Sequence, residues 1–454
     1  MQAGLLDTWK RPMRSRGAIA WVASLALITF YLLLYLPGST FFPNFPDVLT
    51  PIATAMHLPS KWFLYGLLYS TAMVIGGFFM LRKHGNSRYH RIRTITVVAV
   101  QVVLAFSLPL ALNIAGKPEL YLTYVWPLSY DKLFPSTLAG LPPAAALWFV
   151  FASLVLFPVL AFRYGKRFYC SWVCGCGGLA ETFGEPWRHL SNRSTGAWRF
   201  EQWSIHGVLV LVLLTTGLVV ADSVSRAGVV GDAGGPNGAA WALSTALAKE
   251  AADLGDTSLP PSSAELKAQA ASVRARVEAL DPPDWLREKL APVEEAASRG
   301  AAAEQAQLVH DLAYNVVPSG PLGRAASSLK GAYAFFIGAV FSGVAGVGLY
   351  PLMGTRVWCR FGCPMAAILG LVQKLGRFRI AVKKDMCISC GNCSAYCEMG
   401  IDVRAYAQAN LDVRRASCVG CGMCAHVCPR GVLRLTNEAD AGPGVNAGQW
   451  VLDL

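Results

Sequence analysis

The chain has 454 residues, of which 54% are hydrophobic and 15% are charged, with a mean hydropathy of +0.40 and a net charge of +12. This apolar composition excludes a soluble protein of this size and predicts several membrane spans. We expect the positive charge on the cytoplasmic flanks of the spans. Because no aromatic-basic module typical of RNA binding accompanies it, nucleic acid is not an expected partner.

Six apolar stretches are long enough to cross a bilayer. The first lacks a small-residue cleavage site, so we expect a span there and not a cleavable signal peptide. The predicted spans cover residues 18–36, 62–81, 95–114, 144–162, 205–220 and 332–353.

Lysine and arginine residues are distributed unequally between the two sides. The segments on one side carry 4, 5 and 6 of them, and those on the other carry 1 and 2. The long 222–331 loop is left out because long loops do not follow the positive-inside rule. The richer side is therefore expected in the cytoplasm, with both chain termini, as in a multi-pass protein of the bacterial inner membrane. All 13 cysteines fall on that side, as expected of thiols and clusters in a reducing compartment.

Residues 222–331 differ from the rest in being rich in alanine with Glu, Gln and Arg. Pro260-Pro261 and Pro282-Pro283 interrupt the segment, which predicts two or three short amphipathic helices outside the membrane, on the periplasmic side. Two interpretations stay open, a small helical cap and a docking surface for an outer partner.

Two short cysteine turns follow the fourth and sixth spans at an offset of 189 residues. Both read Arg, apolar, aromatic, Cys, three residues, Cys, which indicates an internal repeat with both turns at one depth. The four thiols are a possible third site that binds a metal or a third cluster; they are otherwise redox dithiols or buried structural cysteines. Cys176 has no counterpart, so it is a spare or a substitute ligand. The first turn contains Arg167, Cys170 and Cys174, and the second contains Arg356, Cys359 and Cys363.

Eight cysteines near the C-terminus form the spacing C-x2-C-x2-C-x3-C twice, separated by twenty residues. Two-residue gaps let three cysteines reach the irons of one cubane, while the displaced fourth crosses to the other cubane. Zinc is disfavoured because it prefers separated Cys pairs or Cys/His sets. The predicted ligands are Cys387, Cys390, Cys393 and Cys428 for the first [4Fe-4S] cluster, and Cys397, Cys418, Cys421 and Cys424 for the second.

This segment resembles a bacterial two-cluster ferredoxin domain, which implies an α+β fold. Pro429 follows the last cysteine as in that family, whereas Glu398 replaces the usual proline of the first repeat, so a looser turn is expected there.

With the paired turns, residues 140–220 and 332–436 resemble the membrane-bound 4Fe-4S polyferredoxin superfamily. This includes the quinol dehydrogenase subunit of periplasmic nitrate reductase, the nitrous-oxide regulator and the oxidase-assembly protein of the FixG/RdxA type. In the first turn, Gly175 stands where the motif has a proline after the second cysteine.

We therefore expect an α-helical membrane protein with six transmembrane helices and a C-terminal α+β two-cluster ferredoxin domain. The helix after Cys363 is apolar along one side and basic toward its end, as in a helix lying on anionic lipid or in a simple connector. The predicted divisions are 1–221 for spans one to five, 222–331 for the insert, 332–380 for the sixth span, second turn and interfacial helix, 381–436 for the ferredoxin domain and 437–454 for the tail.

None of the seven histidines lies in the middle of a span, which disfavours a bis-histidine haem b. His426 lies in a cluster loop and is expected to tune the cluster or face solvent, not to ligate. Gln101 lies inside the third span, where an interhelical hydrogen bond is favoured over a quinone or ion site.

The function expected is that of a membrane-anchored electron-transfer protein. It would relay single electrons between the quinone pool and a redox protein partner through two [4Fe-4S] clusters, as a quinol dehydrogenase component does. The alternatives are a copper-reducing oxidase-assembly factor that uses the juxtamembrane thiols, and an iron–sulfur redox sensor. No catalytic residue or nucleotide-binding fingerprint is recognisable.

Overall fold

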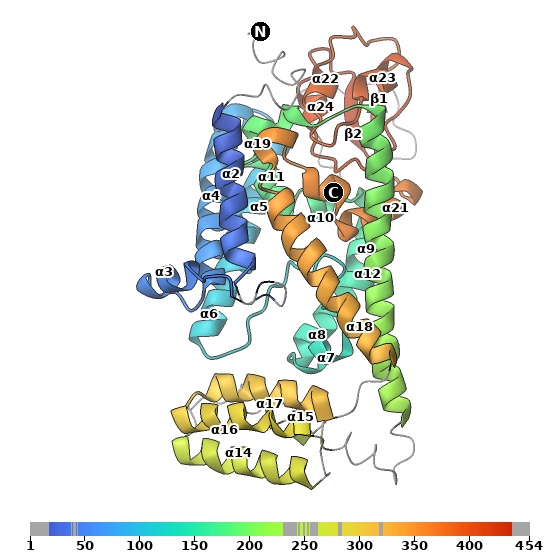
Figure 1. Ribbon diagram of the computed structural model, residues 1–454. Helices are drawn as coiled ribbons and strands as arrows, with labels where there is room; N and C mark the ends of the chain where they lie inside the picture. Colours follow the sequence, from blue (N-terminus) through green and yellow to red (C-terminus); the bar gives the residue numbers. More distant parts are fainter. Residues whose placement is uncertain are drawn as a thin grey trace.

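The computed structural model describes residues 18–437, apart from 38, 40–41, 43, most of 230–261, 280–283 and 317–320. The described residues do not include segment 1–17, Pro260-Pro261, Pro282-Pro283 or the predicted tail after its first residue. Figure 1 shows a central bundle of long helices with a small red-orange lobe at one end and a separate group of yellow-green helices at the other.

Six helices of the bundle are long and apolar enough to cross a membrane, as predicted. No more than 33% of any of them is buried inside the protein. Ile19 and Phe78 are 87% and 61% exposed, so the bundle has an apolar outer surface. The six are α2 (Ala18–Tyr35), α4 (Lys61–His84), α5 with η2 and α6 (Arg88–Val100, Gln101–Ser107, Leu108–Ile114), α8 with η3 and α9 (Pro143–Phe151, Ala152–Leu156, Phe157–Tyr164), α12 (Thr195–Val229) and α18 with η5 (Pro321–Ala332, Tyr333–Ala345).

The sixth apolar helix differs from the prediction at both ends. It begins with α18 at Pro321, inside the range assigned to the insert, because the polar residues of α18 lower the hydropathy there. It ends at Ala345, eight residues before the predicted end at Met353. A Cβ at Gly348 would lie 2.6 Å from Cγ1 of Ile28, so the glycine allows the chain to turn tightly against α2.

Short helices surround the bundle and form the cysteine turns. Cys170 ends α10 and Cys174 precedes α11, while Cys359 lies in α20 and Cys363 precedes α21. These elements are α3 (Leu49–Ala55), α7 (Pro135–Ala139), α10 (Arg167–Cys170), α11 (Gly175–Glu181), η4 (Glu185–Leu190), α19 (Tyr350–Met353), α20 (Val357–Phe361) and α21 (Pro364–Leu375).

The insert is helical, as predicted, but its described part has four helices where two or three were expected. Val273, Val293 and Val309 are fully buried in a core of its own. Ser262 and Glu265 form a reciprocal cap at the start of α14. The helices are α14 (Ser263–Glu278), α15 (Asp284–Arg287), α16 (Leu290–Arg299) and α17 (Ala302–Val316).

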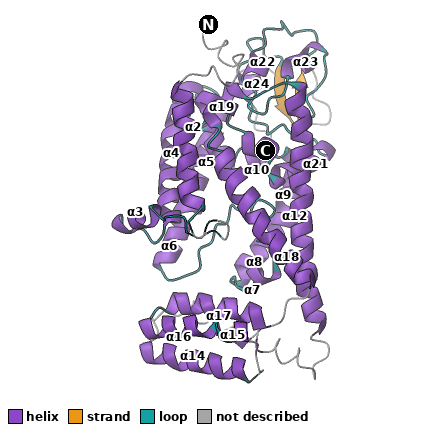
Figure 2. Cartoon of the chain, in the orientation of Figure 1, coloured by secondary structure: helices purple, strands orange, loops and turns teal. Residues whose placement is uncertain are grey.

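The C-terminal lobe combines a two-stranded antiparallel sheet with three short helices, which confirms its α+β class (Figure 2). In each cysteine repeat a glycine precedes the short helix, with φ of 81° at Gly391 and 79° at Gly422. Both need the left-handed conformation that glycine adopts without strain. The elements are β1 (Arg379–Val382), α22 (Asn392–Ala395), α23 (Val403–Gln408), α24 (Met423–His426) and β2 (Leu433–Thr436).

Helix α21, for which a position on the lipid surface was one expectation, is instead a buried connector. It packs against α9 and α12, and most of its residues are buried, including Gln373 at 4% exposure. The Gln373 amide donates hydrogen bonds of 3.0 Å to the carbonyls of Arg415 and Cys418. Most of the apolar side of α21 therefore faces protein, while Leu371 and Leu375 are exposed.

The lobe is attached to the bundle through the backbone of one cysteine loop, residues 418–421. Each of its four carbonyls accepts a hydrogen bond from a side chain of the bundle or of α21. Because buried carbonyls need partners, this loop is held in place at four successive peptide groups. The donors are Gln373 to Cys418 (3.0 Å), Ser171 to Val419 (2.8 Å), Tyr89 to Gly420 (2.8 Å) and Arg93 to Cys421 (2.5 Å).

Replacing Ser171 by alanine tests this attachment. The change leaves the buried Val419 carbonyl without its donor, which costs about 1–3 kcal/mol. We expect a lower unfolding midpoint and faster amide hydrogen exchange in residues 418–424. Ser298→Ala is the matched control, because the Ser298 hydroxyl donates to the exposed Glu295 carbonyl within one helix. Equal exchange of the loop in both variants would contradict the attachment.

Candidate iron–sulfur site

The four cysteines predicted for the first cluster border one small hollow at the free side of the lobe. Cys387, Cys390, Cys393 and Cys428 line it, together with Arg404 and Arg430. Cys390 is exposed while Cys393 is buried. Four sulfur donors around one hollow fit a cubane ligand set.

The four cysteines predicted for the second cluster lie deeper, against the bundle. Cys418 and Cys424 are each 6% exposed, and Cys424 is within electrostatic range of Cys421, Cys418 and Cys397. Burial raises the pKa of the Cys418 thiol to about 11. These cysteines would therefore ionise only with a strong positive centre beside them, which the irons of a cluster supply.

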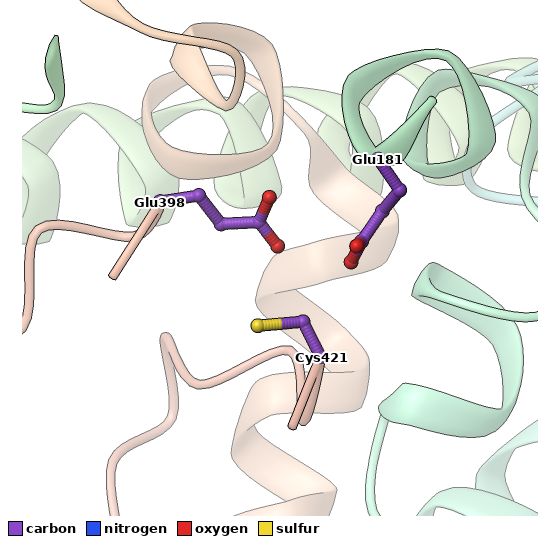
Figure 3. A group of neighbouring side chains, drawn as sticks. All are labelled: Glu181, Glu398 and Cys421. Atoms are coloured by element: carbon purple, nitrogen blue, oxygen red, sulfur yellow. The ribbon is translucent and has the colours of Figure 1, made fainter. Parts of the chain in front are cut away.

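Among the described residues, three ligand atoms of Glu181, Glu398 and Cys421 lie within 4.8 Å of one another. Glu181 and Glu398 belong to a buried ion network between the bundle and the lobe. Figure 3 shows their carboxylates facing each other beside the Cys421 sulfur. Both are 1% exposed, and three buried arginines already neutralise them, so the group is not a cation site. The distances are Arg93–Glu181 2.7 Å, Arg188–Glu181 2.9 Å, Arg356–Glu181 2.7 Å, Arg356–Glu398 3.0 Å and Arg188–Glu398 3.3 Å.

The arginines keep Glu181 ionised although it is buried. Burial alone would raise the pKa of Glu181, but the charges of Arg93, Arg188 and Arg356 outweigh it and hold that pKa well below its usual range. Arg188 and Arg356 are in turn held charged by the two glutamates, which raise their pKa values against the effect of burial. The network is therefore a set of mutually dependent charges.

The expectation of a looser turn at Glu398 was wrong. Its side chain is held by Arg188 and Arg356, and its carbonyl accepts a 2.5 Å hydrogen bond from Ser191. Glu398, which replaces the proline of the family motif, supplies one of the two anions of the network.

The same arginines reach sulfur atoms on both sides of the interface. Nη1 of Arg188 lies 3.8 Å from Sγ of Cys421, and Nη1 of Arg356 lies 3.6 Å from Sγ of Cys359. Arg356 thus contacts a juxtamembrane cysteine with one nitrogen and Glu398 with the other. A continuous set of polar contacts joins the two groups of cysteines.

The two juxtamembrane turns lie in one buried core, as the repeat predicted. Cys170, Cys174, Cys359 and Cys363 are 4–6% exposed and within electrostatic range of one another. The Cys176 thiol donates to Cys174 and lowers the pKa of Cys174 to about 7, whereas burial raises that of Cys170 to about 12. Cys176 is therefore part of this group of thiols.

The surroundings of Gly175 explain why the first turn has no proline. A Cβ there would lie 2.5 Å from the Tyr124 hydroxyl and 2.7 Å from Oε1 of Gln101. Gln101 donates to the Val173 carbonyl at 2.6 Å and accepts from Tyr69 at 3.3 Å. Gln101 thus makes the interhelical hydrogen bond that was favoured from the sequence.

His426 packs against two histidines that sequence reasoning did not connect with it. Its ring centroid lies 5.2 Å from that of His84 and 4.8 Å from that of His90. His84 also contacts Glu185 at 3.3 Å. His426 therefore serves as an interface residue between the lobe and the α4–α5 pair.

Replacing Glu398 by glutamine tests the ion network. The change leaves Arg356 and Arg188 buried with one anion in place of two, and breaking such a pair costs about 3–5 kcal/mol. We expect a lower unfolding midpoint and earlier loss of the lobe in limited proteolysis. Glu278→Gln is the control, since its pair with Arg274 is exposed and should leave the midpoint unchanged. A midpoint equal to that of the unmodified protein would contradict the role of Glu398.

Comparison with known protein families identifies both groups of cysteines. Residues 380–435 match a family described as a 4Fe-4S dicluster domain. Residues 146–194 and 335–383 both match one described as a 4Fe-4S binding domain. The second match begins 189 residues after the first, from 146 to 335, which confirms the internal repeat.

One curated relative supports the same assignment over a short stretch. YccM of Escherichia coli (strain K12), named as an electron transport protein, is 40% identical over 48 residues, or 11% of this chain. The match spans 13% of the length of that relative. No solved structure matches the chain. The chain thus carries one match to a 4Fe-4S dicluster domain, two matches to a 4Fe-4S binding domain and a short stretch that is similar to an electron transport protein.

Proposed function

We propose that this chain is a membrane-anchored carrier that relays single electrons between the quinone pool and a redox protein through two [4Fe-4S] clusters. The ligands would be Cys387, Cys390, Cys393 and Cys428 for the first cluster, and Cys397, Cys418, Cys421 and Cys424 for the second. Each cluster, when bound, stores one electron. The observation that carries the proposal is the fixed attachment of the 418–421 loop to the bundle, with the Cys390 side of the lobe exposed.

The six apolar helices support a place in the cytoplasmic membrane. Their outer surfaces carry exposed apolar side chains, which lipid would cover. The lobe lies at one end of the bundle and the insert at the other (Figure 1). The lobe and the basic segments would then lie in the cytoplasm and the insert in the periplasm.

The juxtamembrane thiols are proposed to hold a third redox-active group, either a cluster or a metal. Four buried cysteines and Cys176 converge there, and Lys166 and Arg356 provide positive charge that suits anionic sulfur. Arg356 connects this group to Glu398, the neighbour of the second-cluster ligand Cys397. The contacts lead from the bundle to the second cluster.

The second candidate function is a metal-handling assembly factor, favoured by the same five thiols. In that case they would reduce or hand over copper, a soft metal that thiolates bind well. A double variant with Cys359→Ser and Cys363→Ser distinguishes between the two functions. Lost copper reduction with intact ferredoxin-cluster spectra supports assembly. Lost oxidation of quinol with unchanged copper handling supports electron relay.

The relay is tested directly by adding a reduced short-chain quinol to the anaerobic protein in liposomes. We expect the visible absorbance of the clusters to bleach, because electrons can enter from the bundle side. Dithionite provides the reference for full reduction. Bleaching by dithionite but by no quinol analogue would contradict the quinone half of the proposal.

The exposed side of the lobe is proposed to dock an acidic redox protein. Ile388 is 56% exposed beside Cys390. Four exposed basic residues lie on the surrounding segments, against Asp385 and Asp402 as exposed acids. An apolar centre with a mainly basic rim suits a partner with an acidic rim. The basic residues are Lys383, Lys384, Arg404 and Arg430.

Reversing charge at this rim should slow association with an acidic partner such as a flavodoxin. Arg404→Glu with Arg430→Glu is expected to lower the electron-transfer rate constant about tenfold at low salt and to weaken its salt dependence. Lys267→Glu, on an exposed position of the insert, is the control. Equal stopped-flow rates for the two variants would place docking elsewhere.

A further inference from the structure

A cavity of about 560 Å³ lies within the bundle and meets the juxtamembrane thiols at Cys176. Residues of α2, α4, η2, η5 and the loop between α6 and α7 line it, with Glu119 and Lys132 from that loop and Cys176 from α11. Tyrosine is strongly concentrated there, since eight of the 15 tyrosines of the chain line the cavity. These are Tyr31, Tyr35, Tyr65, Tyr69, Tyr121, Tyr124, Tyr130 and Tyr333.

The Cys176 end of the cavity has hydroxyl groups placed beside a thiol. The hydroxyls of Tyr124 and Tyr69 lie 2.5 and 2.7 Å from where a Cβ of Gly175 would be. Tyr69 is bonded to Gln101, whereas the Tyr124 hydroxyl makes no hydrogen bond with the described residues. Any side chain at position 175 would collide with both hydroxyls, so the glycine lets the two tyrosines approach the backbone beside Cys176.

We propose that this cavity binds the ring of a lipid-soluble quinone, with one ring oxygen at the Tyr124 hydroxyl and the ring edge near Cys176. The proposal rests on the electron-relay function and gives it a location. A mostly apolar volume with aromatic walls and hydroxyl groups along its lining suits a flat, uncharged ring. A tyrosine hydroxyl can donate to a quinone carbonyl and accept from a quinol hydroxyl, so both redox forms fit.

The chemistry balances with the acceptors that the proposed function supplies. Oxidation of one quinol breaks two O–H bonds and releases two electrons and two protons. Two one-electron iron–sulfur acceptors in the lobe take the electrons, and the protons pass to water at the Glu119 and Lys132 end. Reduction of a quinone is the reverse. The contacts Cys176–Cys174 and Arg356–Cys359 lie between the cavity and the lobe.

Gly338→Leu is the sharpest test, because it fills the cavity with little strain. Gly338 lines the cavity, and a Cβ there would have one neighbour within 4 Å, the Tyr333 carbonyl at 3.9 Å. Gly217→Leu is the matched control, since a Cβ at this exposed position of α12 meets nothing within 4 Å. Tyr124→Phe removes only one hydroxyl and is the second variant.

The readout is binding of a short-chain azidoquinone, measured by photolabelling with peptide mapping. We expect labelled peptides around residues 62–69 and 121–130 in the unmodified protein and the Gly217→Leu control. Gly338→Leu should weaken binding at least tenfold, and Tyr124→Phe should weaken binding several-fold.

Labelling confined to other helices, or equal labelling in Gly338→Leu and Gly217→Leu, would overturn the site. Labelling that phospholipid displaces as well as quinone does would also overturn the site, because it would indicate a groove for acyl chains. If quinol still reduces the clusters in these cases, the relay function stands and its quinone site lies elsewhere. Cavity labelling without reduction of the clusters by quinol would support the site and contradict the relay function.

Discussion

Three arginines and two glutamates, buried where the helices meet the lobe, are the interaction on which the rest of the structure depends. Removing five charges from water is costly, and the cost is offset only when every charge has close partners. Moving any of these charged side chains away from its partners would therefore be costly. It brings Arg188 to Cys421 and Arg356 to Cys359, so the two groups of cysteines are held in one fixed relation.

This arrangement gives the lobe two different sides. One cysteine loop is bonded to the bundle through four successive carbonyls, while Cys390 and Ile388 are exposed on the other side. In the proposed electron relay, the fixed side would receive electrons from the helices of the same chain and the open side would meet a partner. The tyrosine-lined cavity and the juxtamembrane thiols lie on the fixed side.

Local sequence patterns predicted most of the architecture, because hydropathy and cysteine spacing act over short distances. They predicted six apolar helices, the internal repeat and an α+β lobe. They could not predict contacts between residues far apart in the chain. Arg93 and Arg188 were counted as flanking charges of the positive-inside rule, yet both are buried at the interface. Glu398 was interpreted as a loss of proline, because its partner Arg356 lies 42 residues away. For the same reason α21 was considered as a surface helix, although its apolar side is covered by α9 and α12.

The central claim is that the C-terminal cysteines hold two iron–sulfur cubes next to the helix bundle. It is tested most directly by iron and acid-labile sulfide counts, with EPR of the reduced state, on anaerobically purified protein. The account predicts about eight iron atoms and eight sulfides for the ferredoxin lobe, rising to about twelve if the juxtamembrane cysteines hold a third cubane. Colourless protein without acid-labile sulfide would contradict it.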